Sequence, residues 1–432
     1  MRMDAAARGS ACVSTEEGSV PLAVMAESSR AAYSDVAIPT LTAVATERVR
    51  PATKLIALLA LGHLVTDVNQ GSLSAILPFL KAAHNLSYAA AGTIVLAANV
   101  MSSVIQPAFG YLSDRTARRW LLPAAVLTSG LGLGLTGIAP SYLAVLVLIF
   151  VMGLGVAAYH PEGYKTATGV AGDRKATALS WFSLGGNIGV AIGPALITML
   201  VTGLGLAGAL GMIVPSLVVA ALLIAALPWI SRASTPGVAA TARAAERGVN
   251  MPRAMALLIG VVALRSWTQL GFTTFVPFYY VDHLKADPRI VGPLLFVFLG
   301  AGALATVVAG PIADRWGTRP LIQWGFLLAT PCAILFLLSS GVVAIVMLGL
   351  VGAILISAFS VCVVLGQAYL PRNTGMASGL IVGFAIGAGG LGVTALGWIA
   401  DHHGLPAVLW ISALLPLAGF VAARFLPAPR AS

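Results

Sequence analysis

Ionisable and amide side chains interrupt the apolar segment at residues 55–80. His63 and Asp67 are four residues apart, so they share one face of a helix, and Gln70 lies about one turn further along. A charged side chain at the centre of a membrane helix costs about 2.5 to 3.5 kcal/mol on insertion scales and is usually functional. We therefore predict that Asp67 takes up and releases a proton, with His63 beside it; a purely structural ion pair or hydrogen bond is the alternative.

A second apolar segment, at residues 254–281, carries Arg265, with Gln269 on the same helical face. At about 1.5 Å per residue, Asp67 lies about 18 Å from the start of its segment and Arg265 about 16 Å from the start of its own. The two charges therefore lie at matching depth. A guanidinium stays charged and offers a planar fork to phosphate or carboxylate, so Arg265, Gln269, Gln70 and Gln367 are our candidate substrate-binding residues.

A compact group of base, helix breaker and acid follows the segment at 142–160, in the order His160, Pro161, Glu162. We expect Pro161 to end or kink the helix there. His160 titrates near neutral pH and Glu162 could share its proton, so both join the proton-coupling candidates; a helix end at which both side chains meet water explains the pattern equally well. His63, Asp67, His160 and Glu162 are also metal-ligand types, but no HxxxH or HExxH pair is present, and we expect no metal and no other cofactor.

These side chains lie in a chain whose composition is that of a polytopic membrane protein. Of its 432 residues, 58% are hydrophobic and 9% are charged, against about 25% charged in soluble proteins. The mean hydropathy is +0.93. Apolar runs of the roughly 20 residues that a span requires predict twelve transmembrane helices, near residues 55–80, 88–111, 120–138, 142–160, 177–202, 206–230, 254–281, 290–312, 320–338, 342–369, 375–400 and 405–426.

The polar segments divide the chain and orient it. We predict a disordered cytoplasmic tail at 1–53, six-helix bundles at 54–230 and 254–427, an Arg-rich cytoplasmic linker at 231–253 and a short tail at 428–432. With the N-terminus inside, the predicted cytoplasmic segments carry eighteen Lys and Arg residues and the opposite face three, which places both termini in the cytoplasm.

A repeated loop relates the two bundles. GYLSDRTARR begins at Gly110 and GPIADRWGTR at Gly310, 200 residues later. The loop resembles the GxxxDRxGRR signature of the major facilitator superfamily, whose fold has two parallel six-helix halves around a midplane site. Glycine lets helices approach and the acid pairs with arginines, so we predict a gate rather than a turn of solvated charges; its residues are Gly110, Asp114, Arg115, Arg118, Arg119, Gly310, Asp314, Arg315 and Arg319.

The segment at 177–202 is rich in glycine. Gly189 and Gly193 form a GxxxG surface for close helix packing, and Pro194 supplies a bend. With Gly185 and Gly186 they resemble the GxxxGP core of the superfamily's antiporter motif, although the paired glycines that follow in that motif are absent. Ordinary packing glycines explain the segment as well as antiport does.

Five longer sequence segments resemble one family within this superfamily. GHLVTDVNQGSLSAILPFL, QPAFGYLSDR, YHPEG, FSLGGNIGVAIGP and GMASGLIVGFAIGAGGLGVTALGWIAD together resemble the fosmidomycin resistance family of drug exporters over residues 55–426. The resemblance implies a proton-driven efflux protein of the bacterial cytoplasmic membrane, with a small phosphonate as the type substrate. It also places Asp67 and Arg265 across a central cavity, where we expect them to pair when substrate is absent.

The sequence thus predicts an all-α secondary transporter that exchanges protons for a small compound by alternating access. A proton-coupled importer of an organic acid, with the same fold and residues, is the alternative. An enzyme is not expected, because no nucleophile lies beside a base and no Walker loop is present. The expected partners are the substrate, protons and the bilayer, with no nucleic acid, and we expect a monomer to function.

Overall fold

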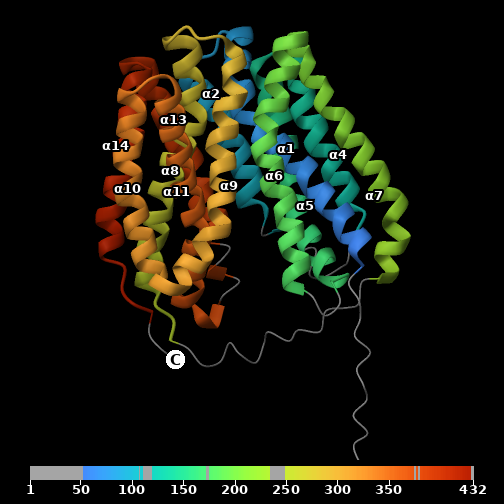
Figure 1. Cartoon of the computed structure of the whole chain (residues 1–432). Coiled ribbons are helices and arrows are strands. Elements are labelled where there is room, and N and C mark those ends of the chain that lie inside the picture. The colour runs from blue at the N-terminus through green and yellow to red at the C-terminus, as the bar shows by residue number, and fades with distance from the viewer. Residues whose placement is uncertain are drawn as a thin grey trace, which may run out of the picture. The chain divides into compact units, whose positions relative to one another are not determined.

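The computed structural model describes residues 52–429, apart from 107, 110–118, 172–174, 234–248, 374–375 and 378–379. The predicted N-terminal tail and most of the predicted linker lie outside the described residues. All regular secondary structure in the described residues is helical, as predicted, and Figure 1 shows long helices that run alongside one another.

The helices of the first half of the chain coincide closely with the first six predicted spans. They are α1 (Thr53–His84), α2 (Tyr88–Asn99) with the π-helical turn η1 (Val100–Val104), α4 (Leu121–Gly134) with η2 (Leu135–Ile138), α5 (Tyr142–Gly169), α6 (Lys175–Leu204), and η3 (Leu206–Met212) leading into α7 (Ile213–Ala233).

The second half follows the other six spans. It contains α8 (Pro252–Phe278) with η4 (Tyr279–His283), η5 (Pro288–Ile290) leading into α9 (Val291–Trp316), α10 (Thr318–Leu338), α11 (Gly341–Tyr369), η6 (Pro371–Asn373), η7 (Leu380–Ala385) leading into α13 (Ile386–His403), and α14 (Leu405–Arg424).

Nine of the described helical segments are long and apolar enough to cross a membrane. The other three predicted spans are α1, α2 and α13. Polar side chains such as Asp67 and Asn69 lower the hydropathy of α1, α2 is short, and α13 ends in Asp401 and two histidines. In α1, the candidate site residue Asp67 thus itself makes the span less apolar.

The fourth span differs from its prediction. Helix α5 continues through Pro161 to Gly169, so the expected helix end at His160 is wrong. Tyr159 holds this part of α5 against α1, because it is fully buried and its hydroxyl donates to the backbone oxygen of Leu59 (2.6 Å). Packing against a neighbouring helix thus carries α5 past the proline.

Helices α1 and α6 pack closely through glycine. A Cβ atom at Gly185, Gly189 or Gly193 of α6 would collide with the backbone oxygen of Ala60, Leu64 or Val68 of α1, respectively. These glycines recur every four residues and so form one stripe. Pro194 lies inside α6 directly after the stripe.

The two halves of the chain meet through α2 against α13, α6 against α9, and α1 against α8. We call the end of α1 that carries Lys81 the Lys81 end, and the opposite end the Lys54 end. One buried cluster near the Lys81 end combines residues of both halves, for example Leu77 and Phe275. Near the Lys54 end, the described core residues form two separate clusters, one in each half. The halves therefore share a core only toward the Lys81 end.

Candidate functional site

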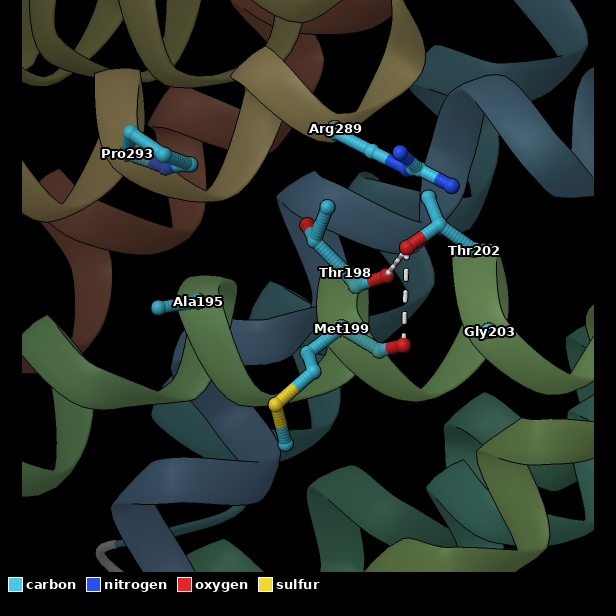
Figure 2. Close-up of a pocket in the computed structure, with 7 residues that line it drawn as sticks. All are labelled: Ala195, Thr198, Met199, Thr202, Gly203, Arg289 and Pro293. Atoms are coloured by element: carbon cyan, nitrogen blue, oxygen red, sulfur yellow. Dashed lines mark hydrogen bonds between the residues drawn. The ribbon is translucent and has the colours of Figure 1, made fainter.

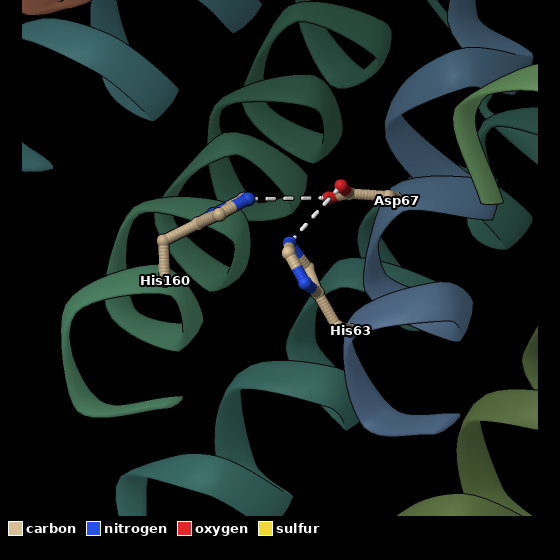
Figure 3. Close-up of side chains that lie close together, drawn as sticks. All are labelled: His63, Asp67 and His160. Carbon is tan, nitrogen blue, oxygen red and sulfur yellow. Dashed lines mark ion pairs between the residues drawn. The ribbon is translucent and has the colours of Figure 1, made fainter. Parts of the chain in front are cut away.

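The centre of the first half holds three ionisable side chains in contact, shown in Figure 3. Asp67 of α1 lies between two histidines: its Oδ2 is 3.3 Å from His63 Nε2, and its Oδ1 is 3.4 Å from His160 Nε2 of α5. His63 and Asp67 are 3% and 6% exposed, and His160 is partly buried. The sequence spacing suggested the pair of His63 and Asp67, and the structure adds His160 to it.

The other ring nitrogens fix the tautomers of both histidines. His63 Nδ1 is 2.8 Å from the backbone oxygen of Phe182, and His160 Nδ1 is 2.8 Å from that of Val156. A carbonyl oxygen can only accept, so each Nδ1 carries a hydrogen. In a neutral ring, Nε2 is then a bare acceptor that faces another acceptor, the Asp67 carboxylate. Each of the two contacts therefore requires a proton, on the ring or on the carboxyl group.

The charge of the cluster follows from counting these protons. With an ionised Asp67 and two neutral rings the net charge is −1; one added proton makes it 0 and satisfies one contact, and a second makes it +1 and satisfies both. The arrangement can therefore store one or two protons in a buried site.

Aromatic rings and one glycine enclose the cluster. The His63 ring stacks on Phe182 (4.3 Å between centroids) and meets His160 edge to face (4.9 Å). A Cβ at Gly186 would lie 2.5 Å from His63 Nε2 and 2.6 Å from Asp67 Oδ2. Gly186 is thus the residue of α6 that leaves room for the imidazole–carboxylate pair.

Two imidazoles and a carboxylate are also groups that can bind a divalent metal, and their nearest ligand atoms lie within 4.8 Å of one another. Shared protons account for the two short contacts without an ion. Glu162 is buried (1% exposed) on α5 but does not belong to this group of three.

Arg265 of α8 does not pair with Asp67, so the expected pairing is wrong in this structure. Its Nε donates to the backbone oxygen of Leu355 (2.5 Å), and a terminal nitrogen donates to Gln269 Oε1 (2.6 Å). Its guanidinium also lies over the ring of Phe359, 4.9 Å from the centroid. Among the described residues, this buried cation (3% exposed) has no carboxylate within 4 Å.

The remaining substrate-binding candidates lie on three helices. Gln269 supports Arg265 directly, whereas Gln70 on α1 and Gln367 on α11 are partly buried. The structure thus brings Gln269 into contact with Arg265.

The repeated gate motif is described only in part. Gly110, Asp114, Arg115 and Arg118 lie outside the described residues, and Arg119 precedes α4 in a turn. In the second copy, Gly310, Asp314 and Arg315 lie in the last turns of α9, and Arg319 lies in the first turn of α10. Among the described residues, a Cβ at Gly310 would meet nothing within 4 Å, so these residues show no close helix approach at this glycine.

At the Lys81 end, a polar network that the sequence did not predict joins the two halves of the chain. Lys81 Nζ lies 3.3 Å from Asp282 Oδ2, which also accepts a hydrogen bond from the Tyr88 hydroxyl (2.9 Å). Asp401 of α13 accepts from the backbone N–H groups of Tyr88 (2.7 Å) and Ala89 (2.9 Å), at the start of α2. The only signal in the sequence is that both acids stand at the ends of predicted spans.

Comparisons with known proteins agree with this architecture. The sequence profile of the Major Facilitator Superfamily matches residues 59–384 and 288–432. The chain is 33% identical over 378 residues to YfnC of Bacillus subtilis, an uncharacterised MFS-type transporter (85% of this chain and 91% of that protein). It is 32% identical over 393 residues to the fosmidomycin resistance protein of Escherichia coli (89% of this chain and 95% of that protein).

Solved structures show the same fold. The nucleoside transporter NupG superposes with a TM-score of 0.68 at 15% identity, covering 86% of this chain and 98% of that chain. The xylose transporter XylE of E. coli gives a TM-score of 0.65 at 17% identity, with 87% and 96% covered. Described helices lie at the twelve expected positions in the expected order, and nine of them are long and apolar enough to cross a membrane. Together with the sequence profile and the relatives above 30% identity, they lead to one conclusion: this chain belongs to the Major Facilitator Superfamily and is a multi-pass membrane transporter, not an enzyme.

Proposed function

We propose that this transporter is a proton-driven antiporter that exports a small anionic compound, such as a fosmidomycin-like phosphonate, by alternating access. The observation that carries the proposal is the separation of two buried sites of opposite chemistry. A proton-sharing cluster lies in the first half of the chain, and a cation with no carboxylate partner among the described residues lies in the second half.

The cluster of His63, Asp67 and His160 has the properties of a proton-coupling site. It is buried, one proton satisfies one of its two contacts, and a second proton satisfies both. Its members lie on two helices, α1 and α5, so movement between these helices would change the contacts that hold the protons. We assign Glu162, which is buried on the same helix as His160, as a further candidate on the proton path.

Arg265 is the proposed anion-binding residue. Burying a cation is costly unless it is paired, and its hydrogen-bond partners here are neutral groups. A substrate phosphonate or carboxylate would supply the missing negative charge. Gln269 and Phe359 hold the guanidinium in place, and Gln70 and Gln367 are the proposed neutral contacts.

The excess of Lys and Arg in the predicted cytoplasmic segments supports an orientation in the bacterial inner membrane with both termini and the Lys54 end in the cytoplasm. In this orientation the shared core and the polar network at the Lys81 end would close the periplasmic side. The motif around Asp114 and Asp314 would then form the cytoplasmic gate. We further propose that one copy of the chain performs the transport.

A second candidate function, proton-coupled import of an organic acid, is favoured by the charges of the same residues. Adding a proton to the cluster makes its charge more positive and so favours the binding of an anion. Protons and anions would then bind together, as a symporter needs. Export requires instead that protonation and substrate binding favour opposite conformations.

The sign of a pH change separates these two functions. Purified protein is reconstituted in liposomes that contain a pH-sensitive dye, and fosmidomycin or an organic acid is added outside without a pH gradient. Antiport moves protons out as substrate enters, so the lumen becomes more alkaline; symport makes it more acidic. Both signs are independent of the orientation of the protein in the liposome.

The Asp67→Asn variant is the control for the coupling site. It keeps the size of the side chain and removes the titratable charge, so we expect the substrate-dependent pH change to be lost. An undiminished pH change in this variant would contradict the assignment of Asp67. Substrate uptake without any pH change in the unmodified protein would contradict proton coupling itself.

A further inference from the structure

A pocket of about 450 Å³ lies between the two halves of the chain, near the Lys81 end. Figure 2 shows its lining: one face of α6 from Ala195 to Gly203, and opposite it Arg289 of η5 and Pro293 at the start of α9. Helices α6 and α9 are in contact beside the pocket: a Cβ at Gly292 of α9 would lie only 2.9 Å from the Cα of Ala195 of α6. The pocket thus follows the line where α6 and α9 meet.

Two polar groups at the pocket lack a partner. The hydroxyl of Thr198 is buried (3% exposed) and makes no hydrogen bond within the described part of the chain. Arg289 is exposed, and among the described residues its guanidinium has no carboxylate within 4 Å. In Figure 2 the Arg289 side chain extends across the pocket toward Thr202. A cation and an unused hydroxyl are the groups that a phosphate would engage.

A third polar residue, Thr202, also lines the pocket, but its hydroxyl donates to the backbone oxygen of Thr198. The other lining residues are Ala195, Met199, Gly203 and Pro293, and this part of the lining extends into the depth of the membrane. At about 1.5 Å per residue, Thr198 lies about 9 Å and Ala195 about 14 Å from the end of α6 at Leu204. One leaflet of a bilayer contains about 15 Å of hydrocarbon. Met199, which follows Thr198 in sequence and lines the pocket, is 63% exposed. The pocket therefore passes from a charged group near the surface to apolar side chains at the depth of acyl chains.

From this geometry we infer that the pocket is a binding site for an anionic phospholipid, with its phosphate at Arg289 and Thr198 and an acyl chain along Met199 and Ala195. The apolar part distinguishes a lipid from a free anion, which would use only the polar end. The lipid would contact α6 in the first half and Arg289 in the second, so it would strengthen the contact between the halves at the Lys81 end. The inference goes beyond the transport proposed above and does not depend on it.

The test measures lipid binding by the purified full-length chain in a neutral detergent, with native mass spectrometry during titration. The probes are phosphatidylglycerol, phosphatidylcholine with the same acyl chains, and glycerol phosphate without chains. We expect phosphatidylglycerol to bind more tightly than the other two. The Arg289→Gln variant should weaken its binding about tenfold, as expected when one charge-assisted hydrogen bond is lost.

Two further variants keep the result interpretable. Lys285→Asn removes a cation at the same end of the protein but outside the pocket, so it should bind phosphatidylglycerol as the unmodified chain does. Thr198→Val keeps the shape of the side chain and breaks no bond that the structure shows, so it should fold normally and bind the lipid more weakly.

Three outcomes would overturn the inference. These are equal binding of both phospholipids, undiminished binding of phosphatidylglycerol by Arg289→Gln, and binding of glycerol phosphate as tight as that of the lipid. The last outcome would assign the pocket to a free anion. Because none of these readouts involves transport, the test is independent of substrate, direction and proton coupling.

Discussion

In the polar network at the Lys81 end, Asp282 contacts both Lys81 and Tyr88 of the first half of the chain. Replacing Asp282 by Asn tests whether this network holds the two halves of the chain together. Its carboxylate pairs with Lys81 at 3.3 Å and accepts from the Tyr88 hydroxyl at 2.9 Å. The Lys81 ammonium also lies 4.4 Å from the centre of the Tyr88 ring. Asp282→Asn keeps the shape and the capacity to accept, but removes the charge.

The size of the effect follows from these contacts. The pair is about three-quarters buried, with 23% and 29% of the two side chains exposed, so loss of the ion pair is worth about 1 kcal/mol. Converting a charge-assisted hydrogen bond into a neutral one removes about another 1 kcal/mol. A total of about 2 kcal/mol raises the ratio of open to closed molecules at this end about 30-fold.

Electron spin resonance measures this ratio through the distance between two spin labels. Cysteines that replace Leu204 and Leu284 place one label on each half, and both positions are exposed, at 71% and 50%. The three native cysteines are first replaced. We expect a new population at longer distance in Asp282→Asn. Asp287→Asn is the control, because in the described structure the Asp287 side chain bonds only the nearby backbone N–H of Arg289. An unchanged distance distribution in Asp282→Asn would refute the assignment of this network as a closing contact.

Three further predictions concern other parts of the molecule. Gly189→Ala should destabilise the protein by about 1 to 3 kcal/mol, because its Cβ would collide with the Leu64 carbonyl. Gly260→Ala, whose Cβ would meet no described atom within 4 Å, should leave the thermal midpoint unchanged. Equal midpoints for the two variants would contradict the close packing of α1 and α6. Substrate affinity in direct binding should fall in the order Arg, Lys, Gln at position 265, and equal affinity would show that Arg265 has only a structural role. Removal of divalent metals with a chelator should leave transport unchanged, and a loss restored by zinc would show that the cluster around Asp67 needs an ion.

Local patterns in the sequence predicted the helices and the proximity of His63 and Asp67, two of the three residues of the proton-sharing cluster. A run of about 20 apolar residues is enough to identify a span, and the spacing of four residues puts His63 and Asp67 on one face of α1. The link to His160 was not predictable, because it depends on how α5 packs against α1. The proline after His160 even indicated a helix end, which the buried packing of Tyr159 overrides.

Long-range partners escaped prediction for the same reason. Arg265 and Asp67 lie at matching depth, but depth along a helix does not fix the direction in which a side chain points. The oxygen that binds Arg265 Nε belongs to Leu355, 90 residues away, in an apolar helix where nothing marks it as an acceptor. Asp282 and Asp401 likewise gain partners only when helices from opposite halves of the chain come together.

The passage of α5 through Pro161 affects how stiff this helix is beside the proton-sharing cluster. Proline has no N–H, so the carbonyl of Ala157 loses its usual donor, and the carbonyl of Val156 also accepts from the His160 ring. This turn therefore contains fewer backbone hydrogen bonds than an uninterrupted helix, and bending it breaks fewer of them. A small flexing of α5 at this point would change the separation of His160 and Asp67 while the rest of the helix stays rigid. His160 thus contacts Asp67 of α1 from the turn of α5 that bends most easily.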